Sequence, residues 1–186
     1  GGLAKLLYPA TVASLIFCDV PGDHFDEVAS GPTYMDKSYS EDALKILSKY
    51  SLPFNLTLNE TPKEEIYFEK VHNIPLVTNS HALVGMGKRA HELGYDVINI
   101  GADLYGDSEE VIDKLLQASK PHSVVIGAGE PSVIVKGVRG VTGRCQNLTM
   151  ISLEKIGLND TLSSFASDGI DNLSISSGAI ADSITL

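Results

Sequence analysis

VASLIFCDVPGD, at residues 12–23, is the stretch around which the predicted fold is organised. Its apolar part, residues 12–17, has the length and the β-branched character of a buried strand. A polar turn follows, in which proline fixes φ and glycine permits a tight reversal. The turn places Asp19 and Asp23 just past the carboxyl end of the strand, where ligands of open α/β sheets bind. Both acids are therefore candidate site residues, although an ordinary surface turn after a core strand is the alternative.

A second turn, ASGPT at residues 29–33, follows shortly after the first. Its serine, glycine and threonine can present backbone N–H groups and hydroxyls to an anion. We therefore expect Ser30 and Gly31 to contact a substrate or a nucleotide, and Thr33 to offer a hydroxyl. The alternative is again a plain surface turn.

Strands and helices alternate along residues 74–127. Strands are predicted at residues 74–78, 96–100 and 123–127, and helices at residues 81–93 and 108–119. Gly94 ends the first of these helices, and Ser108 is expected to cap the second. Such alternation is typical of a parallel sheet with right-handed crossovers. With the strand at residues 12–18, it predicts a three-layer, Rossmann-like parallel α/β sheet within residues 1–120.

Asn79 lies where one predicted strand passes into the next predicted helix. Free backbone N–H groups and the helix dipole can hold an anion at such a corner. Asn79 is therefore a candidate binding residue, with a plain helix cap as the alternative.

A second, smaller α/β domain is expected over residues 121–186, because the sequence becomes rich in glycine after residue 127. The pattern predicts a glycine turn and an alternating strand within residues 127–137, a glycine loop at 137–147, a helix at 148–156, a strand at 165–171 and a helix beginning at Ser177. The predicted strand at 165–171 ends in paired carboxylates, Asp168 and Asp171.

The composition is that of a folded domain, because 43% of the 186 residues are hydrophobic and 20% are charged. The formal net charge of −10 argues against nucleic-acid and membrane surfaces, which require clustered Lys and Arg. Cys18 and Cys145 show neither disulfide nor metal spacing, which favours a reducing cytosol. The sequence shows no signal peptide and no apolar run that would span a bilayer, so we expect a cytoplasmic protein.

Several motifs resemble those of one enzyme family, the class II glycerate kinases. In the first part of the chain they are PATV at residues 9–12, CDVPGD at 18–23 and ASGPT at 29–33. Downstream they are Gly129-Glu130, GRCQN at 143–147, and DGIDN at 168–172 followed by SISSGA at 174–179. The downstream motifs resemble the family's small C-terminal domain, called the MOFRL domain. The family phosphorylates glycerate to 2-phosphoglycerate with ATP, and its members are often named hydroxypyruvate reductase.

The resemblance implies binding of ATP, Mg²⁺ and glycerate in a cleft between two domains. Arg144 leaves a glycine loop at the start of a helix, where a guanidinium beside N–H groups suits a phosphate or a carboxylate. An arginine that only packs on the loop is the alternative. Glu130 and Gly143 belong to the same motifs and are expected to contact the substrate or the nucleotide.

The acidic pairs are given two different roles by the resemblance. Asp19 and Asp23 are expected to accept the proton of the glycerate hydroxyl or to bind that hydroxyl. Asp168 and Asp171 are candidates to hold Mg²⁺ through oxygen or water, although two acids at a strand end are also a common structural cap. The expected partners are small molecules, and the sequence leaves open whether the chain forms a homo-oligomer.

The chain departs from the family pattern at several positions. Cys145 stands where the family has Asn, Asn147 where it has Glu, and Ile175 where it has an acid. The family's glycine-rich loop and lysine would lie before Gly1, and its last motif after Leu186. We therefore expect these 186 residues alone not to phosphorylate glycerate.

Two other functional classes stay open. One is an NAD(P)H-dependent hydroxypyruvate reductase, although no glycine fingerprint follows a predicted strand with an acid about 20 residues further on. The other is a non-catalytic homologue that binds a small ligand or a partner, which the altered motifs favour.

Overall fold

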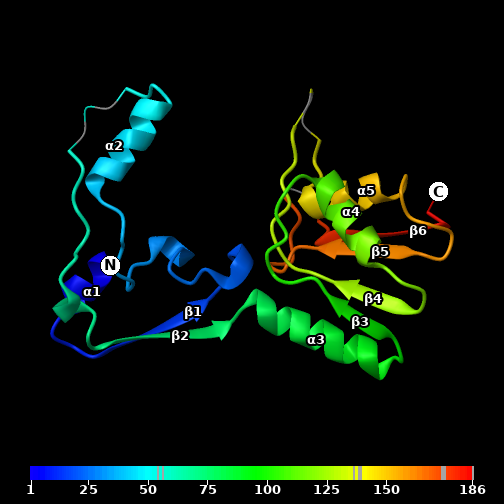
Figure 1. The fold of residues 1–186 in the computed structure, drawn as a ribbon, viewed down its shortest axis with the longest axis horizontal. Helices are drawn as coiled ribbons and strands as arrows, with labels where there is room; N and C mark the ends of the chain where they lie inside the picture. Colours follow the sequence, from blue (N-terminus) through cyan, green and yellow to red (C-terminus); the bar gives the residue numbers. More distant parts are fainter. Residues whose placement is uncertain (54, 56, 136, 138–139, 173–174, 186) are drawn as a thin grey trace. The chain divides into compact units, whose positions relative to one another are not determined.

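The computed structural model describes residues 1–53, 55, 57–135, 137, 140–172 and 175–185 (Figure 1). The α-helices are α1 (Gly2–Leu7), α2 (Ser40–Lys49), α3 (Asn79–Glu92), α4 (Ser108–Ala118) and α5 (Arg144–Ser152), and the short 3-10 helices are η1 (Pro21–Asp23), η2 (Val28–Ser30) and η3 (Glu65–Tyr67). The strands are β1 (Val12–Phe17), β2 (Val71–Val77), β3 (Asp96–Asn99), β4 (Ser123–Ile126), β5 (Thr161–Phe165) and β6 (Gly178–Asp182). Within the described ranges, no helix has both the length and the apolar character needed to cross a bilayer.

These elements form two compact units. The first unit comprises Gly1–Cys18 and His24–Val77, and the second comprises Asp19–Asp23 and Thr78–Leu186. The turn after β1 therefore belongs to the second unit, although β1 itself belongs to the first.

The first unit is built on β1 and β2, which pair in parallel. The pairing begins with Val12 opposite Val71 and shifts between Ile16 and Phe17. The shift lies opposite Pro75, which has no backbone N–H to donate to the ladder. β1 ends directly before the turn that carries the predicted acids.

The second unit begins with helix α3, which packs on the parallel pair β3 and β4. Gly87 allows this close packing, because a Cβ atom there would lie 3.3 Å from a methyl of Ile126 and 3.4 Å from one of Val97. α3 ends before Gly94, whose φ of 88° is one that glycine adopts easily. Helix α4 then connects β3 to β4, as the alternation in the sequence predicted.

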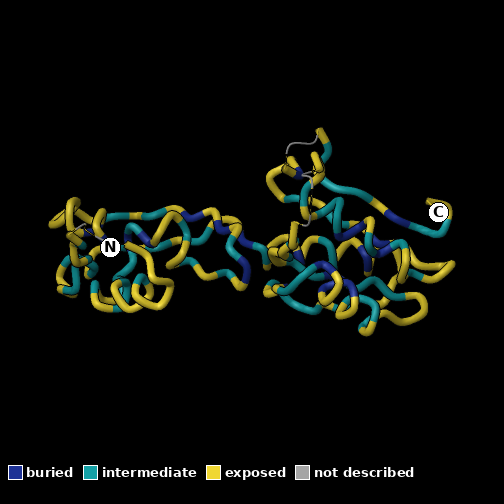
Figure 2. The backbone as a smooth tube through the Cα atoms, turned by 90° about the horizontal axis from the view of Figure 1, so that it is seen from above, coloured by how far each residue is buried: buried dark blue, intermediate teal, exposed yellow. Residues whose placement is uncertain are grey.

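The core of the second unit joins α4 to α5 and β5. Its buried members are Leu104, Val111, Ile112, Leu148 and Leu162. Figure 2 colours the backbone by burial, with buried positions in dark blue. Each fully buried aliphatic side chain stabilises the fold by about 1.5–3 kcal/mol. This packing fixes the axis of α5, and with it the position of the predicted site residue at its first turn.

β5 and β6 form an antiparallel pair where the sequence had predicted other structure. Residues 166–171, predicted as a strand, form a turn after β5, and the predicted helix from Ser177 is strand β6. Both predictions were wrong because cross-strand pairing decides this region. Leu162 lies opposite Ala181 in this pair, and both residues are buried. The pairing also requires glycine at position 178, because a side chain there would collide with the backbone of β5.

Three further boundaries differ from the prediction. α5 begins four residues before the predicted start at Leu148, because an acid from another segment caps it, as described below. Within residues 127–137, the described positions form two isolated parallel bridges, Leu104 with Gly129 and Asp107 with Ser132, in place of the predicted strand. Asp107, not Ser108, caps α4 by accepting a hydrogen bond from the N–H of Glu110 at 3.0 Å.

The four strands predicted at residues 12–18, 74–78, 96–100 and 123–127 are all present. They form two parallel pairs, β1 with β2 and β3 with β4, and the described residues contain no ladder that joins the pairs. The structure is therefore mixed α/β with parallel strands. The three-layer Rossmann-like arrangement stays a prediction, as does a domain boundary at residue 120, which falls inside the second unit.

Candidate functional site

The turn after β1 is held against the start of α3, within the second unit. Asp23 accepts hydrogen bonds from the Asn79 N–H at 3.1 Å and from the Ser80 hydroxyl at 2.5 Å. The Asn79 side chain donates to the carbonyl of Val20 at 3.0 Å. The corner predicted to bind an anion at Asn79 is therefore filled by a carboxylate of the chain itself.

The two predicted catalytic acids differ in their surroundings. Asp23 is half-buried, has a φ of 55° and is fixed by its contacts with α3. The preceding Gly22 donates its N–H to the carbonyl of Ala102 at 2.8 Å, which fixes the turn from its other side. Asp19 is exposed. An external ligand can therefore approach Asp19 directly, but has to displace a neighbour to reach Asp23.

The Ser30–Gly31 turn lies in the first unit and is strained. Ala29, Ser30 and Gly31 all have positive φ angles, of 50°, 62° and 58°. A left-handed conformation costs roughly 1–2 kcal/mol for each residue that is not glycine. Gly31 is required here, because a Cβ atom would lie 2.3 Å from the carbonyl oxygen of Asp26. Ser30 is exposed, as its predicted contact with a ligand requires.

Buried polar contacts hold this strained turn in place. Thr33 is buried, and its hydroxyl lies 2.6 Å from the Asn73 side-chain oxygen on β2 and 3.2 Å from the Ser14 hydroxyl on β1. Thr33 thus points inward, and the expectation that its hydroxyl faces a ligand was wrong. The sequence analysis did not identify Asn73 as a structural residue. The available signal was its position as a polar residue in an otherwise apolar strand.

Arg144 is the first residue of α5 and forms an ion pair with Glu130. Both side chains are about half-exposed. Glu130 is held by its backbone N–H, which donates to the carbonyl of Leu104 at 3.0 Å. At the preceding Gly129, a Cβ atom would overlap the backbone of Leu104. The structure therefore brings together two predicted residues that lie 14 positions apart in the sequence, and gives the guanidinium a resident counter-ion.

Asp171 also contacts this helix start. Its two carboxylate oxygens accept hydrogen bonds from the backbone N–H groups of Cys145 at 3.1 Å and of Gln146 at 2.8 Å. Asp171 is only 4% exposed, whereas Asp168 is exposed and accepts a hydrogen bond from the Ile170 N–H at 3.2 Å.

The predicted acidic pair does not fit a protein-built Mg²⁺ site. Asp171 is buried and directs its oxygens at the backbone of α5, away from solvent where a metal with several waters would sit. In the part of the chain that the structure describes, no three His, Cys, Asp or Glu side chains are grouped closely enough to hold a metal ion.

Burial raises the pKa of the Cys145 thiol, and this effect outweighs the hydrogen bond with Ser164 that lowers it. The thiol therefore stays protonated at neutral pH, where it is a poor nucleophile. Within the described residues, neither Cys145 nor Cys18 forms a disulfide.

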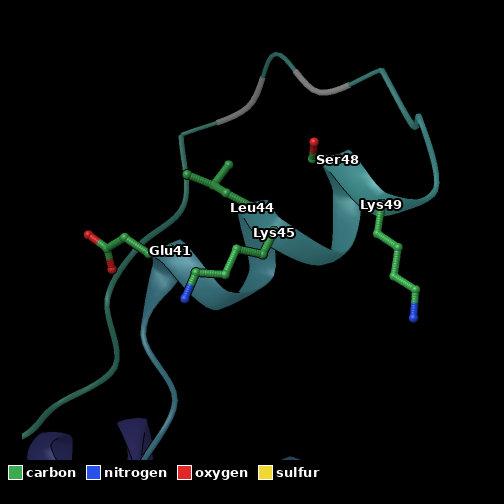
Figure 3. A pocket seen from close by; sticks show the side chains of 5 residues that line it. All are labelled: Glu41, Leu44, Lys45, Ser48 and Lys49. Carbon is green, nitrogen blue, oxygen red and sulfur yellow. The ribbon is translucent and has the colours of Figure 1, made fainter.

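A surface hollow beside α2 does not have the features of a binding site. Its lining residues are Glu41, Leu44, Lys45, Ser48 and Lys49 (Figure 3). All five come from one helix of the first unit, and Figure 3 shows them spread along it. Lys45 is engaged by Asp42 at 2.8 Å. The hollow lacks convergent polar groups from several elements, which a binding site usually has.

The predicted residues are distributed unequally between the units. The second unit contains Asp19, Asp23, Asn79, Glu130, Gly143, Arg144, Asp168 and Asp171. The first unit contains Ser30 and Gly31. Within the second unit, Asp23 meets Asn79 at the start of α3, and Glu130, Gly143, Arg144 and Asp171 gather at the start of α5.

Comparison with known proteins finds relatives of this chain both in sequence and in structure. Residues 1–63 match a family described as a domain of unknown function, DUF4147. The D-glycerate 2-kinase of Thermotoga maritima is 35% identical over 100% of this chain and 48% of its own length. The glycerate 2-kinase of Picrophilus torridus is 32% identical over 98% of this chain and 45% of its own length. The chain thus spans about half the length of the relatives that it matches.

Solved structures agree with the sequence relatives. The crystal structure of a glycerate kinase from Thermotoga maritima matches all of this chain and 48% of its own, with a TM-score of 0.79 and 32% identity. A crystal structure of a protein from Pyrococcus horikoshii matches 93% of this chain and 45% of its own, with a TM-score of 0.67 and 25% identity.

Proposed function

Because the chain is a homologue of the glycerate 2-kinases over about half of their length, we propose that it forms part of an enzyme that transfers the γ-phosphoryl group of ATP to glycerate. The product is 2-phosphoglycerate. The observation that carries this proposal is the similarity of the entire chain to a glycerate kinase structure, at a TM-score of 0.79.

Arg144 is the residue that neutralises phosphate charge in this proposal. Phosphoryl transfer requires positioning and charge neutralisation more than covalent chemistry. The guanidinium lies at a helix start and is accessible, because its ion pair with Glu130 is half-exposed. Such exposed ion pairs stabilise by only about 0–1 kcal/mol, so a phosphate with its higher charge can displace Glu130. Glu130 then remains near the ligand, whereas the space beside Gly143 is occupied by the Asp171 carboxylate.

Asp19 is the preferred acceptor for the proton of the glycerate hydroxyl. Its carboxylate is exposed, whereas that of Asp23 is engaged by Asn79 and Ser80. A general base has to come within hydrogen-bond reach of the proton that it abstracts. In this assignment Asp23 shapes the turn that presents Asp19, and the α3 corner contacts the ligand only if Asp23 moves.

The exposed Ser30 and the N–H groups of its turn are proposed to contact the substrate or the nucleotide. Backbone strain at ligand-binding turns is common, and the buried contacts of Thr33 maintain it here. Magnesium enters the proposal with the phosphates of ATP, and no residue of this chain is assigned as its ligand.

The resemblance of the sequence motifs adds three finer features to the proposal. They are a Rossmann-like domain within residues 1–120, a MOFRL-like domain over residues 121–186, and a cytoplasmic location. Small molecules are the proposed partners.

A phosphorylation assay tests the proposal on two proteins. One is the 186-residue chain, and the other is a chimera in which this chain replaces the aligned part of the Thermotoga maritima D-glycerate 2-kinase. With ATP, Mg²⁺ and D-glycerate, we expect the chimera to form 2-phosphoglycerate and its Arg144→Ala variant to lose most of that activity. A folded chimera without product, beside an active parent enzyme, would contradict the proposal. Oxidation of NADPH with hydroxypyruvate would indicate a reductase instead.

A further inference from the structure

Asp171 connects the last strands of the second unit to the start of α5. Its oxygens accept hydrogen bonds from two consecutive backbone N–H groups, those of Cys145 and Gln146. These groups belong to the first turn of the helix, where N–H groups have no partner within the helix. The residue before the helix is Gly143, which has no side chain to cap them. The cap therefore comes from 25 or more positions further along the chain.

The same carboxylate closes around the residue that precedes Arg144. A Cβ atom on Gly143 would lie 2.0 Å from an oxygen of Asp171 and 2.4 Å from its carboxyl carbon. Such distances are far inside van der Waals contact. Asp171 thus touches the chain on both sides of Arg144, at Gly143 before it and at Cys145 after it.

Asp171 is itself held firmly. Its backbone N–H donates to the carbonyl of Ser176 at 2.8 Å, and the neighbouring Asn172 side chain donates to the carbonyl of Thr142 at 3.2 Å. The turn that carries Asp171 is therefore attached both to the segment just before β6 and to the glycine loop. Its low exposure, 4%, excludes water from the contact and strengthens the charge-assisted hydrogen bonds.

These contacts leave little of Asp171 for a ligand. The N–H groups of Cys145 and Gln146 already have an anionic partner, so an incoming phosphate meets the guanidinium of Arg144 and not the helix start itself. A carboxylate that fixes the backbone on both sides of an arginine also fixes the direction in which its side chain leaves. That direction determines whether the guanidinium can meet a phosphate.

We propose that Asp171 is the positioning residue for Arg144, and not a ligand of the metal or the substrate. The proposal deepens the proposed function and rests on it for the role of Arg144 as the phosphate contact. It predicts that the effect of changing Asp171 is transmitted through the order of the Arg144 side chain.

The experiment uses ¹⁵N-labelled 186-residue chain as wild type and as Asp171→Asn, Asp171→Ala and Asp168→Asn. Asp168 provides the matched control, because it lies in the same turn but is exposed and accepts its hydrogen bond from Ile170. Nuclear magnetic resonance measures amide exchange at Cys145 and Gln146 and the order of the Arg144 Nε–H group. Titration with pyrophosphate, with and without Mg²⁺, measures anion affinity.

We expect both Asp171 variants to raise exchange at the two amides at least tenfold, to disorder Arg144 and to weaken pyrophosphate binding about tenfold, with or without Mg²⁺. Asp171→Asn retains one acceptor oxygen and should change less than Asp171→Ala. Asp168→Asn should match the wild type. Protected amides across β5 and β6 show that a variant is folded. If Asp171→Ala does not fold, the proposal is tested with Asp171→Asn alone.

Three results would overturn the proposal. They are an Arg144 side chain that stays ordered in a folded Asp171 variant, unchanged pyrophosphate affinity despite lost protection, and a loss of affinity seen only with Mg²⁺. A wild type in which Arg144 is ordered by Asp171 but pyrophosphate does not bind would contradict the proposed function and leave the positioning role supported.

Discussion

Helices α3 and α5 both begin beside an acidic side chain from a distant part of the sequence, but the two helix starts are built differently. At α3, Thr78 is a cap of its own, since its hydroxyl oxygen accepts the N–H of His81 at 3.3 Å. Asp23 adds a second, half-buried contact there. At α5 the preceding residue is glycine, and the buried Asp171 serves as the cap alone in the described structure.

Because of this difference, Asp23 can be released from its hydrogen bonds at the helix start, whereas Asp171 cannot. Removing Asp23 leaves α3 with its Thr78 cap and with polar partners, Asn79 and Ser80, that solvent can reach. Removing Asp171 leaves two backbone N–H groups of α5 without their acceptor in a place that water enters poorly. The first acid can therefore exchange its partners for a ligand during function, and the second is fixed.

The largest expected effect is on stability. Hydrogen bonds to a charged group contribute about 1.5–3 kcal/mol each, and unsatisfied buried donors add to the loss. We therefore expect Asp171→Ala to lower the free energy of unfolding by about 3 kcal/mol, whereas Asp23→Ala, with a second cap present, should lower it by about 1 kcal/mol. Urea unfolding of the two variants measures both values. Equal losses would show that the two helix starts do not differ in the way described.

A pair of glycine substitutions sharpens the same comparison. Gly143→Ala brings a methyl group against the Asp171 carboxylate, and overpacking of this kind costs about 1–3 kcal/mol. Gly85→Ala, in the middle of α3, meets nothing within 4 Å and should stabilise the chain by about 0.5–1 kcal/mol through helix propensity. Unfolding curves should therefore shift in opposite directions. A stabilising Gly143→Ala would mean that Asp171 is not packed against the start of α5.

Two charge-removing variants test which helix start receives an anion. Glu130→Gln removes the resident counter-ion of Arg144, so we expect pyrophosphate to bind about three- to fivefold more tightly, which corresponds to the roughly 0–1 kcal/mol of an exposed ion pair. Asp23→Asn uncovers the corner at α3, which has no arginine in its described contacts, and should change the affinity less. Calorimetric titration of both variants and the wild type measures the difference. Tighter binding to Asp23→Asn than to Glu130→Gln would move the anion site to α3.

Sequence predicted the first of these helix starts better than the second. The strands and helices between residues 71 and 126 follow from local periodicity and glycine or proline boundaries, which act within a few residues. β5, β6 and the true start of α5 depend on contacts between residues far apart, such as Leu162 with Ala181 and Asp171 with Cys145. Local propensity carries no information about such partners.

The same limit applies to the candidate site. Motifs identified Asp23, Glu130, Arg144 and Asp171, but not which of them contact one another. One signal was present without being used: a helix that follows Gly143 requires a capping acceptor from elsewhere in the chain. The acids at residues 168–172 were available for that role, and the buried one of them fills it.

The smallest expected effect is on the reactivity of the Cys145 thiol. This reactivity depends on the electrostatic surroundings of the first turn of α5, and it can be measured in variants that keep the fold. Burial raises the pKa of its thiol, and the negative charge of Asp171 raises it further. The thiolate fraction at pH 7 is therefore below that of an ordinary cysteine, and the rate of alkylation should reach its plateau at a higher pH. Asp171→Asn removes the charge and lowers the pKa, so alkylation at pH 7 should become faster, whereas Asp23→Asn, at the other helix, should leave it unchanged. Peptide mapping by mass spectrometry after timed exposure to iodoacetamide distinguishes Cys145 from the buried Cys18. Equal rates for Asp171→Asn and the wild type would show that the carboxylate charge does not affect the first turn of α5. The two helix starts would then not differ in their electrostatics.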